Sequence, residues 1–289
     1  MILITGATGE YGKVVINNLV EKGVNTNEII ALVRDLKKAS DLKEKGIELR
    51  VGNYNDYDSL LTAFYGVDKL LFVSGSEVEN REQQHRNVVN AAKESNIDYV
   101  VYTSFLQNIP VQDSAISFLQ ASHMKTENWI KESGISYTIL RNSTYMDMIP
   151  MFIGESVLQT GIISLPAGEG KSSSVLREEL AEAAANILTS SGHKNKVYSL
   201  ANNESLSYSD IAKEISNITG QEISYHSPAP DEFTNQLKKY NVPDEYIHLL
   251  TAFSLAQAKG ELELKDLTLE KILGRKPYTV KEFLVSIYG

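Results

Sequence analysis

The sequence predicts an α/β fold, a Rossmann-type doubly wound parallel sheet with a smaller C-terminal α/β lobe. In the first half of the chain, short apolar segments alternate with helical segments of about ten residues, which is typical of βαβ units. A turn with the spacing G-x-x-G-x-x-G follows the first apolar segment directly. After about Asn142 the alternation is interrupted by Pro150, Pro166 and a Gly/Ser-rich stretch, which indicates a second lobe.

Each expected strand is a short apolar run, and each expected helix has apolar residues at helical spacing. Near-continuous apolar strands are typical of a parallel sheet that helices cover on both faces. The strands expected in the first half are Ile2–Thr5, Glu28–Val33, Ile47–Val51, Lys69–Val73, Tyr99–Tyr102 and Ser136–Leu140. The helices expected between them are Lys13–Glu21, Leu36–Lys45, Tyr57–Tyr65, Glu79–Ser95 and Ser117–Glu132.

The second half predicts a helix at Arg177–Leu188, a strand at Lys196–Leu200 and a mainly helical remainder with one strand at Glu222–Tyr225. We therefore expect a nucleotide-binding domain over residues 1–145, onto which part of 175–202 packs, and a smaller substrate-side lobe over 146–289. Doubly wound sheets bind ligands outside the carboxyl ends of their strands, so the ligand is expected in a cleft at that edge.

Composition argues against several classes of protein. The chain has 289 residues, a net charge of −9 and no cysteine, so it has no disulfide, no thiolate nucleophile and no cysteine-based zinc site. The negative charge argues against non-specific binding to nucleic acid. None of the five histidines stands at metal-ligand spacing from another, so no metal site is expected. No apolar run could span a membrane and no signal peptide is recognisable, so we expect a cytoplasmic protein.

The glycine turn predicts a dinucleotide site. Gly6, Gly9 and Gly12 stand between an expected strand and an expected helix, the context that such a motif needs. The glycines allow a tight turn and a close approach of the backbone to a pyrophosphate, whose charge the helix N-terminus favours. The alternative is a tight turn that holds no ligand.

The ends of the second and third strands indicate which dinucleotide is bound. An acidic residue after the second strand would bind the ribose 2′-hydroxyl of NAD, whereas Arg34 can bind a 2′-phosphate, so the sequence predicts NADP(H). Asp35 lies one residue further on, and a solvated loop cation is the alternative for Arg34. Asn53 is a candidate acceptor for the adenine amino group, with helix capping by Asn55 or Asp56 as the alternative for this segment.

Several segments together carry a family resemblance. TGATGEYG, ALVRD, LLFVSGSEVENREQQHRNVVNAAKESNI, VYTS and YTILRNSTY resemble the NmrA-like branch of the short-chain dehydrogenase/reductase superfamily. Within that branch the sequence is similar to the bacterial type 2 NAD(P)H:quinone oxidoreductases, through AGEGKSSSVLREELAEAAA to the GRKP near the C-terminus. The resemblance implies an NADPH-binding Rossmann domain, a small C-terminal lobe and reduction of a small quinone.

Carried over by position, the resemblance implies most of the candidate site. The cofactor-binding residues are Gly6, Thr8, Gly9, Glu10, Tyr11, Gly12, Arg34, Asn53, Ser74, Gly75, Ser76, Thr103, Ser104, Asn142 and Ser143. The substrate-side residues are Tyr145, Lys171 and Arg177, the last two from the second lobe. The chain departs from the family where Asn53 stands in place of a frequent Asp. It also has Glu127 where some relatives have a lysine, four residues after the position of His123.

Many dehydrogenases of this superfamily use a Tyr-x-x-x-Lys pair, in which the lysine lowers the pKa of the tyrosine one helical turn away. The expected helix Ser117–Glu132 contains no tyrosine. The one such spacing in the chain, Tyr65 and Lys69, falls at a helix end and is interpreted as chance. The sequence therefore lacks the usual proton donor for reduction of a simple ketone, whose oxygen must be protonated as hydride arrives.

A quinone accepts hydride more readily than a ketone because its product gains aromaticity, so proximity and orientation matter more than a strong acid. Tyr102, Asn142 and Tyr145 are the candidates for chemistry, and packing alone is the alternative for both tyrosines. Two functions stay open: an NADPH-dependent oxidoreductase that reduces quinones by direct hydride transfer, and an NADP(H)-responsive regulator of the NmrA-like type without turnover. A homodimer is also left open.

Overall fold

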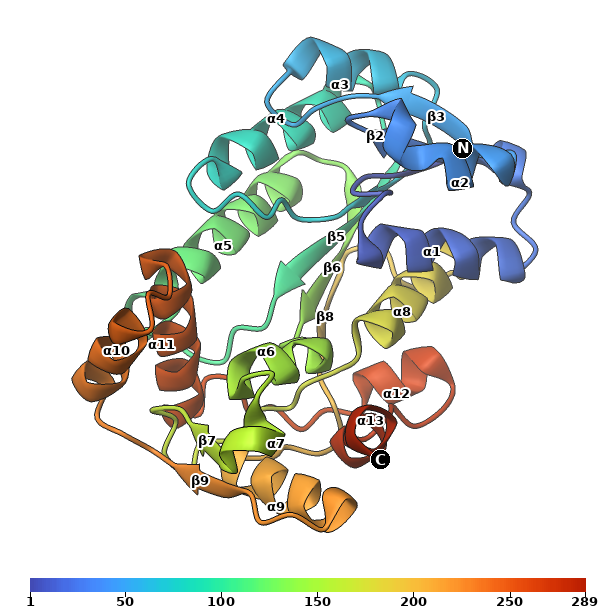
Figure 1. Ribbon diagram of the computed structural model, residues 1–289. Helices are drawn as coiled ribbons and strands as arrows, with labels where there is room; N and C mark the ends of the chain where they lie inside the picture. Colours follow the sequence, from blue (N-terminus) through green and yellow to red (C-terminus); the bar gives the residue numbers. More distant parts are fainter. The chain divides into compact units, whose positions relative to one another are not determined.

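The computed structural model describes residues 1–289 and divides into two compact units (Figure 1). The first unit comprises Met1–Phe105, Phe118–Asn142 and Arg177–Ser199. The second comprises Leu106–Ser117, Ser143–Leu176 and Leu200–Gly289. The first half of the chain therefore leaves the first unit at Asn142, near the boundary expected at residue 145, and the segment 106–117 groups with the second unit.

The first unit is built on a seven-stranded sheet in the order β3-β2-β1-β4-β5-β6-β8. These strands are β1 Ile2–Ile4, β2 Ile29–Val33, β3 Glu48–Val51, β4 Lys69–Phe72, β5 Tyr99–Phe105, β6 Ser136–Asn142 and β8 Lys196–Leu200. Neighbouring strands from β3 to β6 are parallel. The strand order reverses between β1 and β4, as in the doubly wound Rossmann-type sheet that the sequence predicted.

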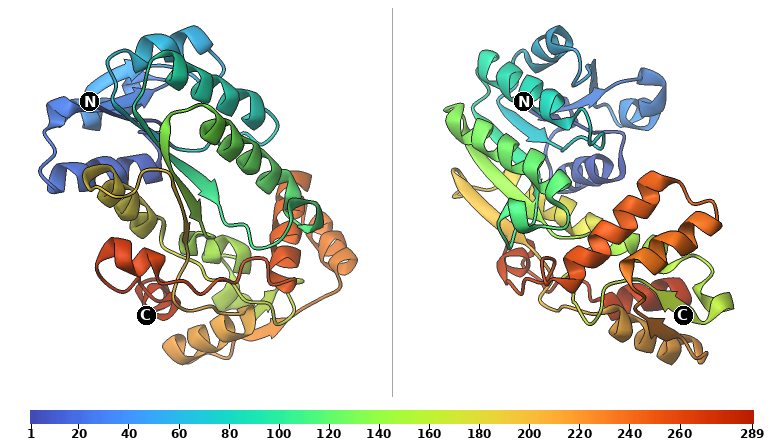
Figure 2. Two further views of the ribbon diagram at one scale, coloured as in Figure 1. Left: turned by 180° about the vertical axis from the view of Figure 1, so that it is seen from behind. Right: turned by 90° about the vertical axis from the view of Figure 1, so that its left-hand side faces the viewer.

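Helices cover both faces of this sheet (Figure 2). In chain order they are α1 Glu10–Glu21, α2 Ser40–Glu44, α3 Tyr57–Phe64, α4 Arg81–Glu94, α5 Ser117–Glu132 and α8 Arg177–Thr189. Leu60 of α3, Val88 of α4 and Ile130 of α5 share one buried cluster with the sheet, so these three helices lie on the same face. On the other face α1 packs against α8.

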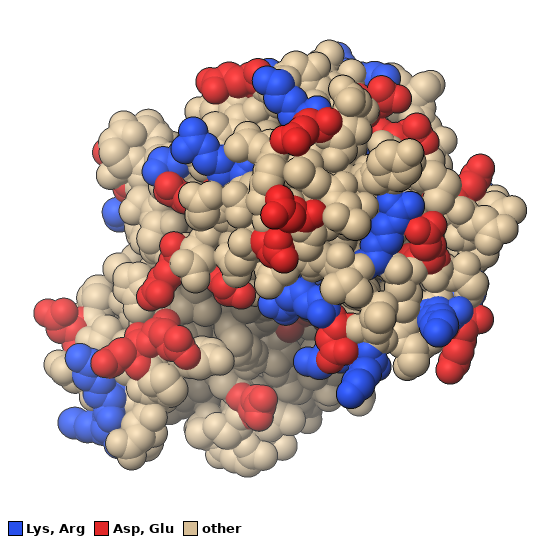
Figure 3. All heavy atoms as spheres, turned by 90° about the horizontal axis from the view of Figure 1, so that it is seen from above, with Lys and Arg blue, Asp and Glu red and all other residues tan.

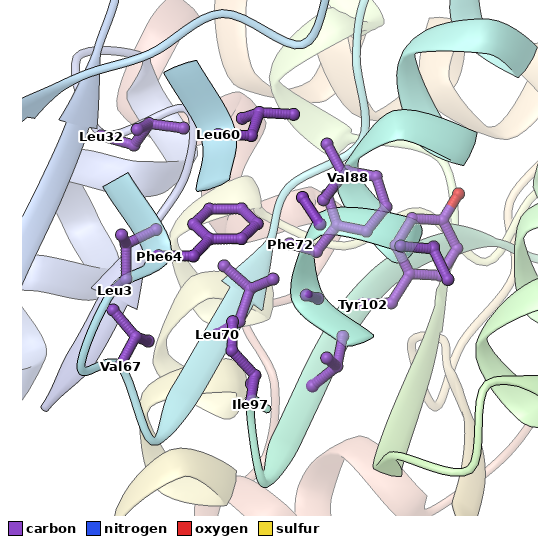
Figure 4. Packing of buried hydrophobic residues seen from close by; sticks show 14 of the residues in the cluster. Leu3, Leu32, Leu60, Phe64, Val67, Leu70, Phe72, Val88, Ile97 and Tyr102 are labelled. Carbon is purple, nitrogen blue, oxygen red and sulfur yellow. The ribbon is translucent and has the colours of Figure 1, made fainter. Parts of the chain in front are cut away.

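The core of the first unit contains aliphatic and aromatic side chains from these strands and helices (Figure 4). Phe64, Leu70 and Phe72 are fully buried within it. Tyr102 belongs to the same cluster and lies beside Val88 in Figure 4. The strand β5 continues to Phe105, whereas the sequence predicted its end at Tyr102. Tyr102 is therefore inside the strand rather than at its carboxyl end.

The second unit is mainly helical with a two-stranded parallel sheet. Its elements are α6 Ile149–Ile153, α7 Val157–Thr160, β7 Ile162–Ser164, α9 Tyr208–Thr219, β9 Ser224–His226, α10 Pro230–Lys239, α11 Asp244–Ala258, α12 Thr268–Leu273 and α13 Val280–Tyr288. A capping box of Ser207 and Asp210 begins α9, and Gly220 ends it with φ of +70°. Tyr208, Phe233 and Phe283 contribute to the core of this unit.

The composition led us to expect neither non-specific binding to nucleic acid nor a membrane span, and surface charge and helix length relate to these two expectations. On the face shown in Figure 3, lysine and arginine side chains are interspersed with aspartate and glutamate rather than gathered in one patch. None of the helices combines the length and the apolar character needed to cross a bilayer.

Candidate functional site

The candidate site residues of the first unit lie at one edge of its sheet. Because β1 to β6 run parallel, their carboxyl ends meet at the same edge. The structure places the glycine turn after β1, Arg34 after β2, Asn53 after β3, Ser74 to Ser76 after β4, Thr103 and Ser104 within the last three residues of β5, and Asn142 at the end of β6. Sequence positions far apart in the chain are thus brought to one edge.

The glycine turn leaves no room for side chains. Gly6 has φ of +59°, in the left-handed region that favours glycine. A Cβ on Gly12 would lie 2.3 Å from the carbonyl oxygen of Gly6, which no packing tolerates. The first helical hydrogen bond of α1 runs from Lys13 N–H to the carbonyl of Gly9. The N–H groups of the preceding helical residues have no acceptor within the helix and face the turn, as at an anion-binding helix N-terminus.

Arg34 is exposed and has one acidic neighbour. Its side chain is 78% exposed, and Nη1 lies 3.8 Å from Oε1 of Glu77 in the loop after β4. Glu77 also accepts a hydrogen bond from Nε2 of Gln84 at 2.8 Å. Asp35 accepts from the backbone N–H of Lys37 and caps a short 3₁₀ turn, so its carboxylate serves the local backbone. Arg34 is thus the charged side chain at the end of β2 that is open to a ligand.

The segment after β3 is partly engaged in capping. The carboxylate of Asp56 accepts from Ser59 N–H and begins α3, which realises the capping alternative for Asp56. Asn53 is exposed, and its side-chain oxygen accepts from the N–H of Asn55. An amide oxygen has two lone pairs, so the role of Asn53 as acceptor for the adenine amino group stays a prediction.

Side chains of the first unit accept hydrogen bonds from the backbone of the loop between β4 and α4. Three successive backbone N–H groups donate to side-chain acceptors at 2.9 Å each: Val73 to Thr5 Oγ1, Ser74 to Thr103 Oγ1 and Gly75 to His85 Nε2. Each acceptor comes from a different part of the unit: the residue after β1, the strand β5 and the helix α4. The path of the loop over the sheet edge is therefore fixed by contacts within the first unit. Thr103, expected to bind cofactor, is almost fully buried and supports this loop.

Tyr102 lies in a buried polar cluster beneath that loop. It is 0% exposed, and its hydroxyl lies 2.8 Å from Nδ1 of His123 on α5. Burial raises the pKa of the Tyr102 phenol well above its ordinary value. Burial, with the charge of Arg81, lowers the pKa of His123 to about 3. This placement corrects the expectation that Tyr102 donates a proton to substrate, since its hydroxyl faces the helix layer.

Ser104 is also turned away from the sheet edge. Its hydroxyl donates to Oε1 of Glu127 at 2.7 Å, and both side chains are buried. Arg141 donates to both oxygens of Glu127, from Nε at 2.9 Å and from Nη2 at 2.8 Å. Burial alone would raise the pKa of Glu127, but the hydrogen bonds from Arg141 and Ser104 outweigh it and lower that pKa. The structure thus engages the hydroxyl of Ser104 with helix α5, and the cofactor contact of Ser104 stays a prediction.

Asn142 and Ser143 carry buried polar atoms without protein partners. Asn142 is 2% exposed, and neither Oδ1 nor Nδ2 has a hydrogen-bond partner. The hydroxyl of Ser143 is likewise buried and unpartnered. Buried polar atoms are rarely left unsatisfied, and such exceptions are concentrated where a ligand or water completes them. Asn142 at the end of β6 is therefore a strong candidate for ligand contact.

The expected substrate-side residues divide between the two units. Tyr145 and Lys171 belong to the second unit, where Tyr145 pairs with Val175 in a parallel bridge and Lys171 Nζ lies 3.8 Å from Asp210. Arg177 is the first residue of α8 and belongs to the first unit, which corrects its assignment to the second lobe.

Tyr65 and Lys69 do not form a pair. Tyr65 caps the C-terminus of α3 and is 82% exposed, and Lys69 begins β4 and donates to the carbonyl of Leu188. No group of three or more histidine, aspartate or glutamate side chains is arranged to hold a metal ion.

Sequence reasoning missed the residues that support the site. Arg81, His85, Val88 and Ala92 share one buried face of α4, at the spacing of successive helical turns. That spacing could have shown that a cation and a histidine lie on the inner face of a helix that otherwise looks polar. Thr5 could have been noticed as a polar residue directly after the first apolar strand.

Comparison with known proteins places the chain in a family. The sequence model of the NmrA-like family matches residues 1–284. Quinone oxidoreductase 2 of Escherichia coli is 36% identical over 289 residues, which cover 100% of this chain and 99% of that protein. The crystal structure of the NADPH-dependent quinone oxidoreductase of E. coli complexed with NADPH has a TM-score of 0.93 at 35% identity and 100% coverage of both chains. The Citrobacter sp. triphenylmethane reductase complexed with NADP(H) has a TM-score of 0.90 at 36% identity, with 99% of both chains covered. The chain therefore belongs to the NmrA-like family, as the segments quoted from its sequence predicted.

Proposed function

We propose that the chain is an NADPH-dependent oxidoreductase that reduces quinones by direct hydride transfer, without a flavin and without a Tyr-x-x-x-Lys pair. The observation that carries the proposal is the full-length likeness to the E. coli quinone oxidoreductase, in sequence and in a structure that contains NADPH. The same edge of the sheet here carries a glycine turn and an exposed arginine, the two features that NADPH requires.

The residues at this edge fit the cofactor. The turn at Gly6–Gly12 is so tight that a Cβ on Gly12 would meet the backbone of Gly6 and Ala7, and the N-terminus of α1 follows it. Arg34 is open to a 2′-phosphate, and Asp35, which would have favoured NAD, is used as a cap. The unpartnered amide of Asn142 offers both a donor and an acceptor, which suits another amide such as the nicotinamide carboxamide.

When bound, NADPH supplies the hydride, and the chain's own residues bind, orient and exclude water. Backbone N–H groups at the start of α1 would hold the pyrophosphate, and Arg34 the 2′-phosphate. The loop Ser74–Ser76 would carry the sugar and nicotinamide end, with Asn142 beside it. From the family resemblance we propose Tyr145, Lys171 and Arg177 as the substrate-side groups, with Tyr145 as the proton donor.

The proposed substrate class fits the chemical groups that the first unit offers. In α5, where related dehydrogenases place their acid, His123 and Glu127 are buried and engaged in hydrogen bonds. A quinone needs no strong acid during hydride transfer, since its product is a stabilised phenolate. Orientation of donor and acceptor then supplies most of the acceleration.

The second candidate is an NADP(H)-responsive regulator without turnover. It is favoured by the polar side chains of α5, which bond to other protein groups and offer no acid to a substrate. A turnover assay distinguishes the two candidates. The pure protein is mixed with NADPH and several small quinones, and the decrease of NADPH absorbance is followed. We expect oxidation of NADPH that depends on protein and quinone concentration. Tight NADPH binding with no oxidation by any quinone would support the regulator instead.

Cofactor preference is tested with Arg34→Ala and a matched control, Lys22→Ala. Lys22 is an exposed cation that follows the C-terminus of α1, at the opposite end of that helix from the glycine turn. Loss of a charge-assisted contact is expected to weaken NADPH binding at least tenfold and NADH binding little. Lys22→Ala should leave both unchanged. A wild-type preference for NADH that Arg34→Ala does not alter would refute the NADP assignment.

A further inference from the structure

One glycine in the loop after β4 has both of its backbone polar groups held by side chains of a single helix. The N–H of Gly75 donates to Nε2 of His85 at 2.9 Å, and the carbonyl of Gly75 accepts from Nε of Arg81 at 2.8 Å. Arg81 and His85 are one turn apart on α4, so they grip the loop from the same helical face. We call these two side chains the Gly75 clamp.

The histidine of the clamp is oriented by its own partners. Nδ1 of His85 lies 2.8 Å from Oγ1 of Thr126, which donates to the carbonyl of Ser122. Because Thr126 donates its proton to that carbonyl, it accepts from Nδ1–H, and Nε2 carries the lone pair that Gly75 needs. The charged or titratable groups around the ring are Arg81, Tyr102 of β5 and His123 of α5. Burial, His123 and Arg81 lower the pKa of His85, so the ring keeps this lone pair at neutral pH.

The arginine of the clamp is unusual for a structural cation. Arg81 is 4% exposed and pairs with no carboxylate; its other contact is Nη1 to Oγ of Ser122 at 3.4 Å. Burial without an ionic partner is costly, and it lowers the pKa of Arg81. A side chain that served only to fill this space would be more stable as a neutral one. We infer that the guanidinium of Arg81 is charged in order to donate a strong hydrogen bond to the carbonyl of Gly75.

Gly75 has little room for a side chain. A Cβ there would lie 2.9 Å from Oε1 of Gln84, which is buried on the same helix and would have to move. The position of the backbone, not of a side chain, is therefore what the clamp determines. Ser74 and Ser76, on either side of Gly75, are residues on which the proposed cofactor would lie.

We propose that Arg81 and His85 are positioning residues that hold the Gly75 peptide in the place where the loop supports the sugar and nicotinamide end of NADPH. The proposal rests on the proposed function. A loop fixed before binding loses no further conformational entropy when the cofactor arrives, so the clamp contributes to affinity without touching the cofactor. It also predicts that the two residues act together, since either one alone leaves half of the peptide unheld.

Two amide variants of His85 separate positioning from packing. In His85→Gln the side-chain oxygen can reach the place of Nε2, whereas in His85→Asn the amide matches only the place of Nδ1. We measure the NADPH dissociation constant by fluorescence of the bound cofactor, and amide hydrogen exchange of the peptide 73–80 without cofactor. His85→Asn should raise the dissociation constant about tenfold and speed exchange, because the half-buried N–H of Gly75 is left unpaired. His85→Gln should stay within about threefold of the wild type in both.

A double-variant cycle tests the joint action. Arg81→Met removes the donor to the carbonyl, and Arg81→Lys keeps a cation of similar reach. If the clamp is one unit, Arg81→Met combined with His85→Asn weakens binding by less than the product of the single effects. Arg81→Lys should recover part of the loss. Thermal unfolding of each variant identifies any that fail to fold. If a variant of one residue fails, the two variants of the other residue, compared with each other, still test the clamp.

Three results would overturn the proposal. One is unchanged exchange in His85→Asn, which would show that the loop is not held by the clamp. The second is faster exchange with unchanged NADPH affinity, which would show that the cofactor does not use the held loop. The third is equal losses in His85→Gln and His85→Asn, which would indicate packing alone. Failure of the proposed function is recognised separately, because the wild type would then oxidise no NADPH with any quinone, whereas the exchange and NADPH-binding results still report on the loop.

Discussion

Nη1 of Arg34, at the end of β2, lies 3.8 Å from Oε1 of Glu77 in the loop after β4. A 2′-phosphate bound at Arg34 would therefore meet the carboxylate of Glu77 nearby. We expect Glu77→Gln to lower the NADPH dissociation constant about two- to fivefold, the range of an exposed ion pair. NADH, which lacks the phosphate, should gain less. Titration of both cofactors measures the difference, and the gain should shrink in high salt.

Glu79→Gln is the matched control for this prediction. Glu79 is an exposed carboxylate of the same loop with no ion pair in the structure. Its neutralisation should change NADPH affinity by less than about twofold, an order-of-magnitude bound for an unpaired surface charge. Equal gains for NADPH and NADH in Glu77→Gln would mean that Glu77 does not oppose the phosphate.

We expect the ion pair between Glu127 and Arg141 to contribute strongly to the stability of the fold. Removing one partner of a buried ion pair leaves the other charge uncompensated, so Glu127→Gln is expected to lower the free energy of unfolding by about 3 kcal/mol. Glu132→Gln, an exposed carboxylate at the end of the same helix, should change it by less than about 0.5 kcal/mol. Urea unfolding measures both. Similar small losses in the two variants would show that the pair contributes little.

The same pair predicts how stability depends on pH. The folded pKa of Glu127 is lowered below its ordinary value of 4.5, so the folded state binds this proton more weakly than the unfolded state. Its contribution is therefore complete above the ordinary pKa and is lost as pH falls through the folded pKa. The difference in unfolding free energy between the wild type and Glu127→Gln should be constant from pH 7 to about 5 and shrink below about pH 4. A difference that grows on acidification would contradict this sign.

The two candidate tyrosines should behave differently when each loses its hydroxyl. Tyr102→Phe leaves Nδ1 of His123 without its partner, so we expect a loss of about 1 kcal/mol in stability with quinone turnover retained. Tyr145→Phe should lower turnover and leave NADPH affinity unchanged if Tyr145 donates the proton. Steady-state rates and urea unfolding of the two variants test this contrast. A large fall in turnover for Tyr102→Phe at unchanged stability would restore Tyr102 as a chemical group.

The sheet of the first unit could be predicted because each strand is a separate apolar run followed by a turn signal. Lys196–Leu200 and Ser117–Glu132 were expected with the bounds that the structure shows. Helices α6 and α7 and strand β7 were not expected, because elements of three to five residues are too short to show a period. In the second unit, pairing of β7 with β9 depends on contacts across about sixty residues that no local pattern reveals.

The prediction that Tyr102 ends its strand and takes part in chemistry was wrong for a simple physical reason. Successive side chains of a strand alternate between the two faces of the sheet. Val100 and Tyr102 therefore share the face that α4 and α5 cover, and Ser104 follows them to meet Glu127. The strand end was placed at Tyr102 because the apolar run stops there, although the backbone pairing continues to Phe105. The contact between the two buried histidines had no signal in the sequence, because it is the packing of α4 on α5 that brings His85 and His123 together.

The glycine turn predicts that two glycines at opposite ends of α1 respond differently to substitution. A Cβ on Gly12 would meet backbone atoms, 2.3 Å from the Gly6 oxygen and 2.8 Å from Cα of Ala7, so the turn itself must open. Gly23, just past the C-terminus of α1, has φ of +84° and no atom within 4 Å of the place a Cβ would take, so an alanine there is strained by backbone conformation alone. We expect both variants to lose about 1 kcal/mol or more of stability. Only Gly12→Ala should weaken NADPH binding, by at least about tenfold, because only there does the pyrophosphate lose its place. Cofactor titration beside thermal unfolding separates the two effects, and equal affinities in the two variants would mean that the turn does not hold the cofactor.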